Sequence, residues 1–344
     1  MQETNKKAGR RGFSALFGGG LAATFLALVI MVVLQCVVIG LNEGSFLGLF
    51  PKLVRAWLNI LRNNTYTGII ALGMCLVVVS GGIDLSVGSM TCAIGAVLMT
   101  LIDTSNGFLP SLGITGVWAY VIAIPVSLIV GMLFGELNGA LVAYGKIPPF
   151  IVTLGTMKIF RSVTQQLTQH FNPVVPSGFK RIASYPIGNQ VVLPILYWIV
   201  AVVIMHVLYN KTAFGKHVVA VGSNERAARF SGIPVKSVKR RVYAISGILS
   251  AVAAIIYVAR IGSMDFANAG SGYEMESIAA VVVGGTAMSG GKGSVAGAFF
   301  GMLIIGVMNN ILNTLGVPTF LCDAVRGAII ILAVLMQRRG KDNE

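Results

Sequence analysis

Charged residues are scarce in this sequence: they occupy 11% of its 344 positions, whereas hydrophobic residues occupy 55%. Soluble globular domains carry about a quarter charged residues. The mean hydropathy is +0.82, and several apolar runs approach the roughly 20 residues that a helix needs to cross a bilayer. Because these runs are spread over the whole chain, the composition excludes a soluble domain with one anchor. It predicts an all-α, polytopic membrane protein.

Cysteine and histidine are also rare. The four cysteines lie in apolar segments without the spacing of a disulfide framework or a zinc site, so we interpret them as small packing residues. The sequence contains no HExxH or GxSxG signature and no pair of acids deep in one span. We therefore expect no enzyme activity, no metal site and no cofactor in this chain.

Hydropathy and helix-breaking residues predict about ten transmembrane helices in a single domain that covers residues 1–344. The expected spans are 17–40, 66–82, 85–102, 117–143, 149–168, 191–209, 242–261, 276–288, 295–315 and 320–336.

Acidic residues number 12 against 26 basic ones, which gives a net charge of +14. Most of the basic residues fall in inner segments if the N-terminus is cytoplasmic, as the positive-inside rule requires. The charge then reflects topology and anionic lipid, and we expect no nucleic-acid partner. Both termini are predicted to be cytoplasmic, with tails at 1–16 and 337–344 and the longest inner loop at 210–241.

Two predicted outer loops differ from this pattern. Segment 41–65 carries Lys52, Arg55 and Arg62 on the outer side, so its topology is left open. Loop 169–190 contains three prolines and is expected to be irregular.

Residues 222–234 of the inner loop read GSNERAARFSGIP and carry the signals of a short helix. Ser223 or Asn224 can cap the free N–H groups at its start. Glu225 suits the positive end of the helix dipole, and Arg229 suits the negative end.

The predicted helix closes at Gly232, which can adopt the left-handed conformation, with Pro234 just beyond it. It has about two turns, too few to be stable alone in water. It presents Ala227 and Ala228 beside Phe230. These residues leave two interpretations open: docking into a groove of a soluble partner, or lying on lipid headgroups.

Residues 284–295, GGTAMSGGKGSV, look like a phosphate-binding loop but do not match its pattern. A Walker loop needs Ser or Thr after Gly-Lys, and here Gly293 follows Lys292. We interpret the segment as a glycine-rich break between two short spans, with Lys292 at the cytoplasmic interface. Any ATPase that drives this protein is therefore expected to be another chain.

The stretch VVVSGGIDLSVGSMT, residues 77–91, places Asp84 between two apolar runs. Only 37 residues separate Tyr66 from Ile102, counted inclusively, so both helices are short. Gly81 and Gly82 are expected to end one of them. We expect Asp84 or Ser86 to cap the next helix, where an acid meets free N–H groups and the positive dipole end.

Four blocks of the sequence carry a family resemblance: GGIDLSVGS at 81–89, PPFIVTLGTM at 148–157, VGSNERAARFSGI at 221–233, and GYEMESIAAVVVGGTAMSGGKGSVAGAFFGMLIIGVMNNILNTLGV at 272–317. They closely resemble the membrane subunits of bacterial ribose-type sugar ABC importers. That family includes permeases for ribose, xylose, arabinose, galactosides and the autoinducer-2 sugar. The resemblance extends from about residue 65 to 336, which is most of the chain.

The resemblance implies a permease of type II ABC importer architecture in the bacterial inner or plasma membrane, as a dimer with a second copy or a paralogue. The implied partners are an external sugar-binding protein and a cytoplasmic ATPase, commonly a twin-cassette polypeptide. Segment 222–233 becomes the coupling helix on that ATPase, and its implied contact residues are Gly222, Ser223, Asn224, Glu225, Ala227, Ala228, Phe230 and Gly232.

A permease for a neutral polyol needs polar groups inside its spans. The candidates for a translocation path or a helix break are Asp84, Ser86, Asn138, Thr153, Thr156, Asn309, Asn310 and Asn313. Hydrogen bonds between helices are the alternative role. We favour that role for Asn309 and Asn313, which are four residues apart on one helix face, and we favour capping for Asp84.

Two alternatives to sugar import stay open. Within the ABC class, the substrate could be a nucleoside. In another class, an ion-coupled secondary transporter would use intramembrane carboxylates. Asp84 is the one clear deep acid, no second acid lies at similar depth, and the docking loop would be unexplained.

Overall fold

The computed structural model describes residues 19–42, 48–169, 171, 173–186, 190–318, 321–329 and 331. All elements of regular structure assigned in these ranges are helices, which confirms the all-α prediction. The predicted cytoplasmic tails 1–16 and 337–344 lie outside the described residues. The helices, in chain order, are α2 (Gly19–Asn42), α3 (Leu49–Asn63), α4 (Thr65–Val79), α5 (Val87–Ile102), α6 (Phe108–Ser111), α7 (Val117–Ala143), α8 (Pro149–Leu167), α9 (Ser177–Ser184), α10 (Leu193–Lys211), α11 (Ala213–Ser223), α12 (Glu225–Phe230), α13 (Val235–Ile261), α14 (Tyr273–Val283) and α15 (Val295–Thr314).

The predicted spans from 17–40 to 295–315 each coincide with one of these helices. Among the described residues, the helices α2, α7, α10, α13 and α15 are long and apolar enough to cross a membrane, and α4 and α5 are shorter apolar helices. In the last predicted span, 320–336, residues 321–329 and 331 are helical and the others lie outside the described residues.

Segment 41–65 is not an irregular connection, because most of it forms the helix α3. This helix is strongly amphipathic: Ile60 is buried, Arg55 is exposed, and Lys52 and Arg62 are half-buried. The chain continues through Asn64 directly into α4, where the Gly68 N–H donates to the Asn64 carbonyl at 2.8 Å. A helical period in a segment with low mean hydropathy marks such a surface helix.

Loop 169–190 is not wholly irregular, because it contains the two-turn helix α9. Pro176 directly precedes its first turn, where a missing N–H costs nothing. Phe179 of α9 is fully buried and packs edge-on against Tyr120 of α7, with ring centroids 5.3 Å apart. Pro176 therefore marks the start of this helix and does not abolish it.

Inner loop 210–241 is also far more helical than expected. It contains α11 and α12, and α13 begins at Val235, seven residues before the predicted span. Thr212 accepts a hydrogen bond from the Gly215 N–H at the start of α11. The basic residues on which the cytoplasmic prediction rests are compatible with helices, so charge predicts a side of the membrane and not a secondary structure.

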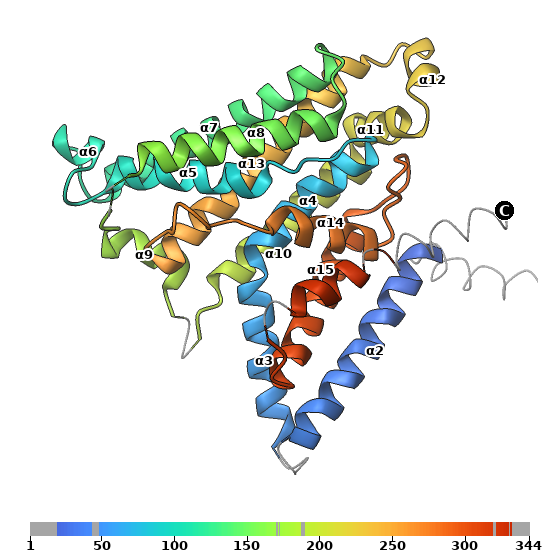
Figure 1. Cartoon of the computed structure of the whole chain (residues 1–344), viewed down its shortest axis with the longest axis horizontal. Coiled ribbons are helices and arrows are strands. Elements are labelled where there is room, and N and C mark those ends of the chain that lie inside the picture. Colours follow the sequence, from blue (N-terminus) through green and yellow to red (C-terminus); the bar gives the residue numbers. More distant parts are fainter. Residues whose placement is uncertain are drawn as a thin grey trace, which may run out of the picture.

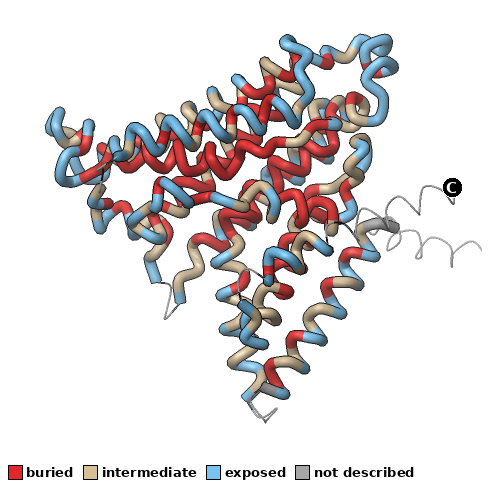
Figure 2. The backbone as a smooth tube through the Cα atoms, in the orientation of Figure 1, coloured by how far each residue is buried: buried red, intermediate tan, exposed pale blue. Residues whose placement is uncertain are grey.

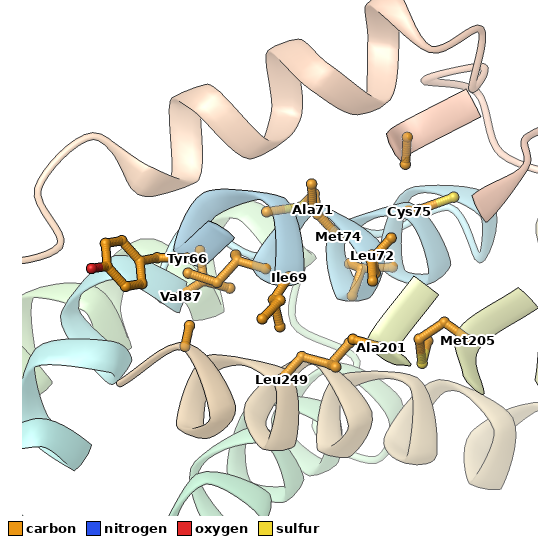
Figure 3. Close-up of a cluster of buried hydrophobic side chains, with 14 of the residues drawn as sticks. Tyr66, Ile69, Ala71, Leu72, Met74, Cys75, Val87, Ala201, Met205 and Leu249 are labelled. Carbon is orange, nitrogen blue, oxygen red and sulfur yellow. The ribbon is translucent and has the colours of Figure 1, made fainter. Parts of the chain in front are cut away.

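The core is built around α4, which is buried along its whole length and passes through the middle of the molecule (Figures 1 and 2). Figure 3 shows Ile69 and Leu72 of α4 with Met205 of α10 and Leu249 of α13 in one apolar cluster. The apolar residues that remain exposed lie mainly on α2, α7, α8 and α10. Apolar side chains therefore cover the exterior of the bundle as well as its interior, as a polytopic membrane protein requires.

Small residues bring α7 and α13 together. Gly131, Gly135 and Gly139 recur every fourth residue on α7, the spacing that allows membrane helices to approach closely. A Cβ atom built on Gly135 would overlap the carbonyl oxygen of Tyr243, and one on Gly247 would overlap that of Gly131. Because α13 also packs on α4 and α5, this pairing fixes where the polar residues of both helices meet.

Candidate functional site

The helix α12 forms as its sequence predicts. Asn224, not Ser223, is the side chain that caps it, and it accepts a hydrogen bond from the Ala227 N–H at 3.0 Å. Glu225 lies in the first turn and pairs with Arg229 at 3.6 Å and with Lys239 of α13 at 2.7 Å. The helix is thereby tied at its start to the helix that follows it.

The end of α12 is closed by glycine. Gly232 has φ +80° and its N–H donates to the Arg229 carbonyl, while the Ile233 N–H donates to the Ala228 carbonyl. This is the left-handed closure that the sequence predicts. In Figure 1, α12 lies at the upper right corner, apart from the main bundle of helices.

One residue of α12 lies on a different face of the helix from the one that the sequence predicts. Ala228 is only 4% exposed and faces the protein body, so it does not lie beside Phe230 on the accessible face. Phe230 is 91% exposed, and Ala227 is exposed with it. Because one turn of helix carries neighbouring residues to different sides, Ala227 and Phe230 form the available surface and Ala228 anchors the helix.

The end of α11, next to α12, is in direct contact with both glycine-containing breaks. The Gly291 N–H donates to the Val79 carbonyl at 2.8 Å, which joins the α14–α15 break to the end of α4. A Cβ atom built on Gly222 would overlap that same Val79 oxygen and would lie 2.7 Å from the Gly291 nitrogen. We call these three residues the glycine junction.

Segment 284–294 serves as the break that the sequence predicts. Gly284 ends α14, three glycines follow at positive φ, and the Ser294 hydroxyl accepts from the Gly297 N–H at 2.9 Å to start α15. Lys292 is exposed, and the Tyr209 hydroxyl of α10 donates to the Gly293 carbonyl at 2.9 Å. The segment is held to its neighbours through its backbone.

Asp84 lies fully buried in the other break, and hydroxyl and amide groups surround its carboxylate. One oxygen accepts the Ser86 N–H at 3.0 Å and the Ser86 hydroxyl at 2.6 Å, and the other accepts the Ser246 hydroxyl at 3.1 Å. Ser86 occupies the N-cap of α5 but makes no side-chain cap. Its hydroxyl instead donates to Asp84, so the acid orders the turn that precedes the helix.

Further polar groups from three helices complete this buried cluster. Asn138 of α7 donates to the Ser86 hydroxyl at 2.8 Å, and its own Oδ1 is buried without a hydrogen-bond partner. Tyr243 of α13 donates to the Ile83 carbonyl at 3.1 Å. The Thr153 hydroxyl of α8 lies 3.3 Å from the same oxygen and 2.9 Å from the Pro149 carbonyl of its own helix. The structure therefore joins four of the predicted candidates, Asp84, Ser86, Asn138 and Thr153, in one place that we call the Asp84 cluster.

Thr156 lies nearby on α8 and is also buried, but it donates to the Thr153 carbonyl of its own helix. Asn309, Asn310 and Asn313 do not join the Asp84 cluster. Arg326 donates to Asn309 at 3.2 Å, and Gln35 of α2 donates to Asn310 at 2.7 Å. All three asparagines line a separate cavity of about 340 Å³.

Several charged groups near the ends of the helices are paired. Arg240 lies 3.1 Å from Glu136, and Arg326 lies 2.8 Å from Asp323. Arg326 also contacts Glu276 of α14 at 3.0 Å, which is a pairing that sequence spacing could not reveal.

Asp265 and Arg161 order the connection between α13 and α14. Hydrogen bonds from the Asn268 side chain and from the Ala267 N–H hold the pKa of Asp265 below its ordinary value. Arg161 of α8 donates to the Ala269 carbonyl at 2.7 Å and so attaches α8 to this connection.

Sequence reasoning missed Tyr243, Ser246 and Gln35 as polar contacts inside the bundle. Ser246 and Gly247 are adjacent small residues inside a span, a weak sign of a close helix contact. Nothing local connects Ser246 with Asp84, because 162 residues separate them.

The family model "Branched-chain amino acid transport system / permease component" matches residues 56–334. The ribose import permease protein of Bacillus subtilis (strain 168) is 40% identical over 320 residues, covering 92% of each chain. The ribose import permease protein of Escherichia coli (strain K12) is 36% identical and covers 91% of this chain and 93% of the relative. The xylose transport system permease protein of the same strain is 32% identical, covering 96% and 95%. No solved structure matches the chain.

Proposed function

The chain belongs to the family of permease components of branched-chain amino acid transport systems, and we propose that it is the membrane-spanning permease of a sugar ABC importer. The relatives that share more than 90% of its length import ribose or xylose, so a monosaccharide is the substrate class. The chain is a transport subunit and not an enzyme. A nucleoside permease and an ion-coupled secondary transporter are not favoured.

An importer of this kind works with an ATPase and a substrate-binding protein, in the multi-pass setting of a bacterial membrane. We further propose that the ATPase is a twin-cassette chain, that the permease pairs with a second copy or a paralogue, and that both termini are cytoplasmic. The clustering of basic residues on the α11–α12 side supports this orientation.

The proposed contact with the ATPase rests on a single observation, the exposed surface of α12. Phe230 is 91% exposed at a corner of the molecule, next to the exposed Ala227, on a helix whose start and end are both held. A large apolar side chain on a small-residue face suits a groove of a soluble partner. Arg226 and Arg229 add positive charge to the same surface.

Motion of α12 would reach the membrane through the glycine junction. The ATPase halves would close on ATP, α12 would follow, and Gly222 would displace the ends of α4 and of the α14–α15 break, because no gap separates them. Each state of the permease is then selected by the nucleotide state of its partner.

The test is uptake of labelled D-ribose and D-xylose into proteoliposomes that contain the permease, its ATPase and the loaded binding protein. We expect uptake to require ATP and to continue after a protonophore has collapsed the proton gradient. An ATPase whose Walker lysine is replaced provides the control. Uptake driven by an ion gradient without ATP would overturn the proposal.

A further inference from the structure

The outer end of α15 borders a cavity of about 340 Å³, enclosed by α3, α14, α15 and the helical segment 321–329. Its size falls within the ~300–1,000 Å³ that small-molecule pockets occupy. Six of its twelve lining residues are asparagines, contributed by two helices that are more than 240 positions apart in the chain: Asn59, Asn63, Asn64, Asn309, Asn310 and Asn313. We call it the asparagine cavity.

The charged residues in this cavity neutralise one another in part. Arg326 contacts Glu276 at 3.0 Å and Asp323 at 2.8 Å, and it also donates to Asn309. The guanidinium is therefore already in contact with two carboxylates and one amide oxygen. Apart from this charged group, the polar lining presented to a ligand consists of neutral amides.

Several of these amides retain hydrogen-bonding capacity. Within the described residues, Asn313 makes no side-chain hydrogen bond, and Asn64 uses only its NH₂ group, on the Ile60 carbonyl at 2.7 Å. Asn63 uses only its oxygen, which accepts from Arg260 at 2.7 Å. An amide offers two donors and a two-fold acceptor. Together these groups present the mixture of donors and acceptors that the hydroxyls of a neutral polyol need.

Two larger cavities of this protein have the apolar lining that is expected of a cavity facing lipid. One of 680 Å³ between α5, α7 and α8 and one of 540 Å³ between α7, α10 and α13 are lined almost wholly by apolar side chains. They suit acyl chains. The asparagine cavity differs from both in composition, although it also lies among membrane helices.

We propose that the asparagine cavity is a low-affinity pentose site on the translocation path, entered from the binding-protein side. This inference rests on the proposed function and adds to it a place in the permease where the sugar is held. The amides replace the hydrogen bonds that the sugar makes with water. Because Asn59, Asn63 and Asn313 are exposed, the site is open enough to release its ligand.

Thiol protection tests the site without ATP or the binding protein. The full-length Asn313→Cys permease, in a Cys322→Ala background because Cys322 also lines the cavity, is treated with a polar methanethiosulfonate. D-ribose and D-xylose at millimolar concentrations are the probes, with glycine betaine at equal osmolality as the solute control. We expect each pentose to slow the reaction at least threefold.

Asn106→Cys is the matched control, since Asn106 is an exposed asparagine on another outer connection and does not line the cavity. Its reaction rate should not change with either sugar. ATP-driven uptake by the unmodified importer is measured in parallel. Uptake without protection would overturn the pentose site and keep the proposed function, whereas protection without uptake would contradict the proposed function alone.

Discussion

Two regions of the bundle differ in how closely they are packed. Beside the end of α11, the glycine junction is so closely packed that one added methyl group would overlap backbone atoms of two other segments. Where α3 meets the end of α15, a cavity of about 340 Å³ remains, and half of its lining residues are asparagines. A close-packed contact transmits displacement, and an open polar cavity accommodates a ligand.

The Asp84 cluster and the asparagine cavity also differ in how far their polar groups are engaged in hydrogen bonds. In the Asp84 cluster, both carboxylate oxygens are engaged by hydroxyl or N–H donors and the acid is fully buried. In the asparagine cavity, Asn313 is exposed and makes no side-chain hydrogen bond within the described residues. Satisfied polar groups hold helices together, and unsatisfied accessible ones are free to bind a substrate.

The largest effect is expected at the glycine junction. Gly222→Ala inserts a methyl group against the Val79 carbonyl and the Gly291 nitrogen. Overpacking costs ~1–3 kcal/mol and occasionally more, and rigid backbone on both sides places this site at the upper end. Transport should fall roughly a hundredfold, and ATP hydrolysis should lose its stimulation by the loaded binding protein.

Gly155→Ala on α8 is the control, because nothing lies within 4 Å of a Cβ atom built there. It should transport normally. If Gly222→Ala also couples ATP hydrolysis to uptake normally, the glycine junction does not carry the motion.

The Asp84 cluster should respond to loss of its acceptor. Asp84→Leu leaves two hydroxyls and one N–H without the carboxylate, and each buried unsatisfied group costs ~1–3 kcal/mol. Because the hydroxyls can rotate to other acceptors, we expect a total of about 3 kcal/mol and less inserted, folded protein in a thermal-melting assay of detergent-solubilised permease.

Asp84→Asn keeps the shape and one acceptor oxygen, so it should cost less than about 1.5 kcal/mol, the worth of one hydrogen bond. It should also transport normally once folded. An Asp84→Asn permease that assembles normally but transports poorly would move Asp84 from a structural role to the sugar path.

The surface of α12 should show an effect on partner binding. Phe230→Ala removes an exposed ring whose burial in a partner's groove would contribute ~1.5–3 kcal/mol. The affinity for the ATPase should fall about 10- to 100-fold in a binding titration. Phe50→Ala, an exposed phenylalanine of α3 at the opposite end, should leave that affinity unchanged. Equal affinities for the Phe230 and Phe50 variants would place the docking surface elsewhere.

Much of this fold follows from local sequence signals. Apolar runs locate α2, α7 and α15, and the residues that cap and close α12 are recognisable from their types alone. The helix α3 was missed because its apolar residues follow a helical period within a segment of low mean hydropathy, which a search for continuous apolar runs does not detect.

The sites were less predictable, because they depend on contacts between distant segments. Asp84 and Ser86 indicate a helix break, but the distance along the chain to Ser246 conceals their partner. Asn309 makes the contact between helical segments that its position suggests, since it accepts from Arg326. Its place beside Asn59, Asn63 and Asn313 in one cavity depends on how α3 packs. Tertiary packing, not residue type, decides which amides are satisfied and which are free.

The central claim is that sugar passes by the asparagine cavity and not through the Asp84 cluster. The most direct test is the number of D-ribose molecules imported per ATP hydrolysed by Asn313→Leu and by Asp84→Asn, each reconstituted with the same ATPase and binding protein. The account predicts that this ratio falls about tenfold, or ~1.4 kcal/mol, in Asn313→Leu and is unchanged in Asp84→Asn. An unchanged ratio in Asn313→Leu together with a reduced ratio in Asp84→Asn would contradict it.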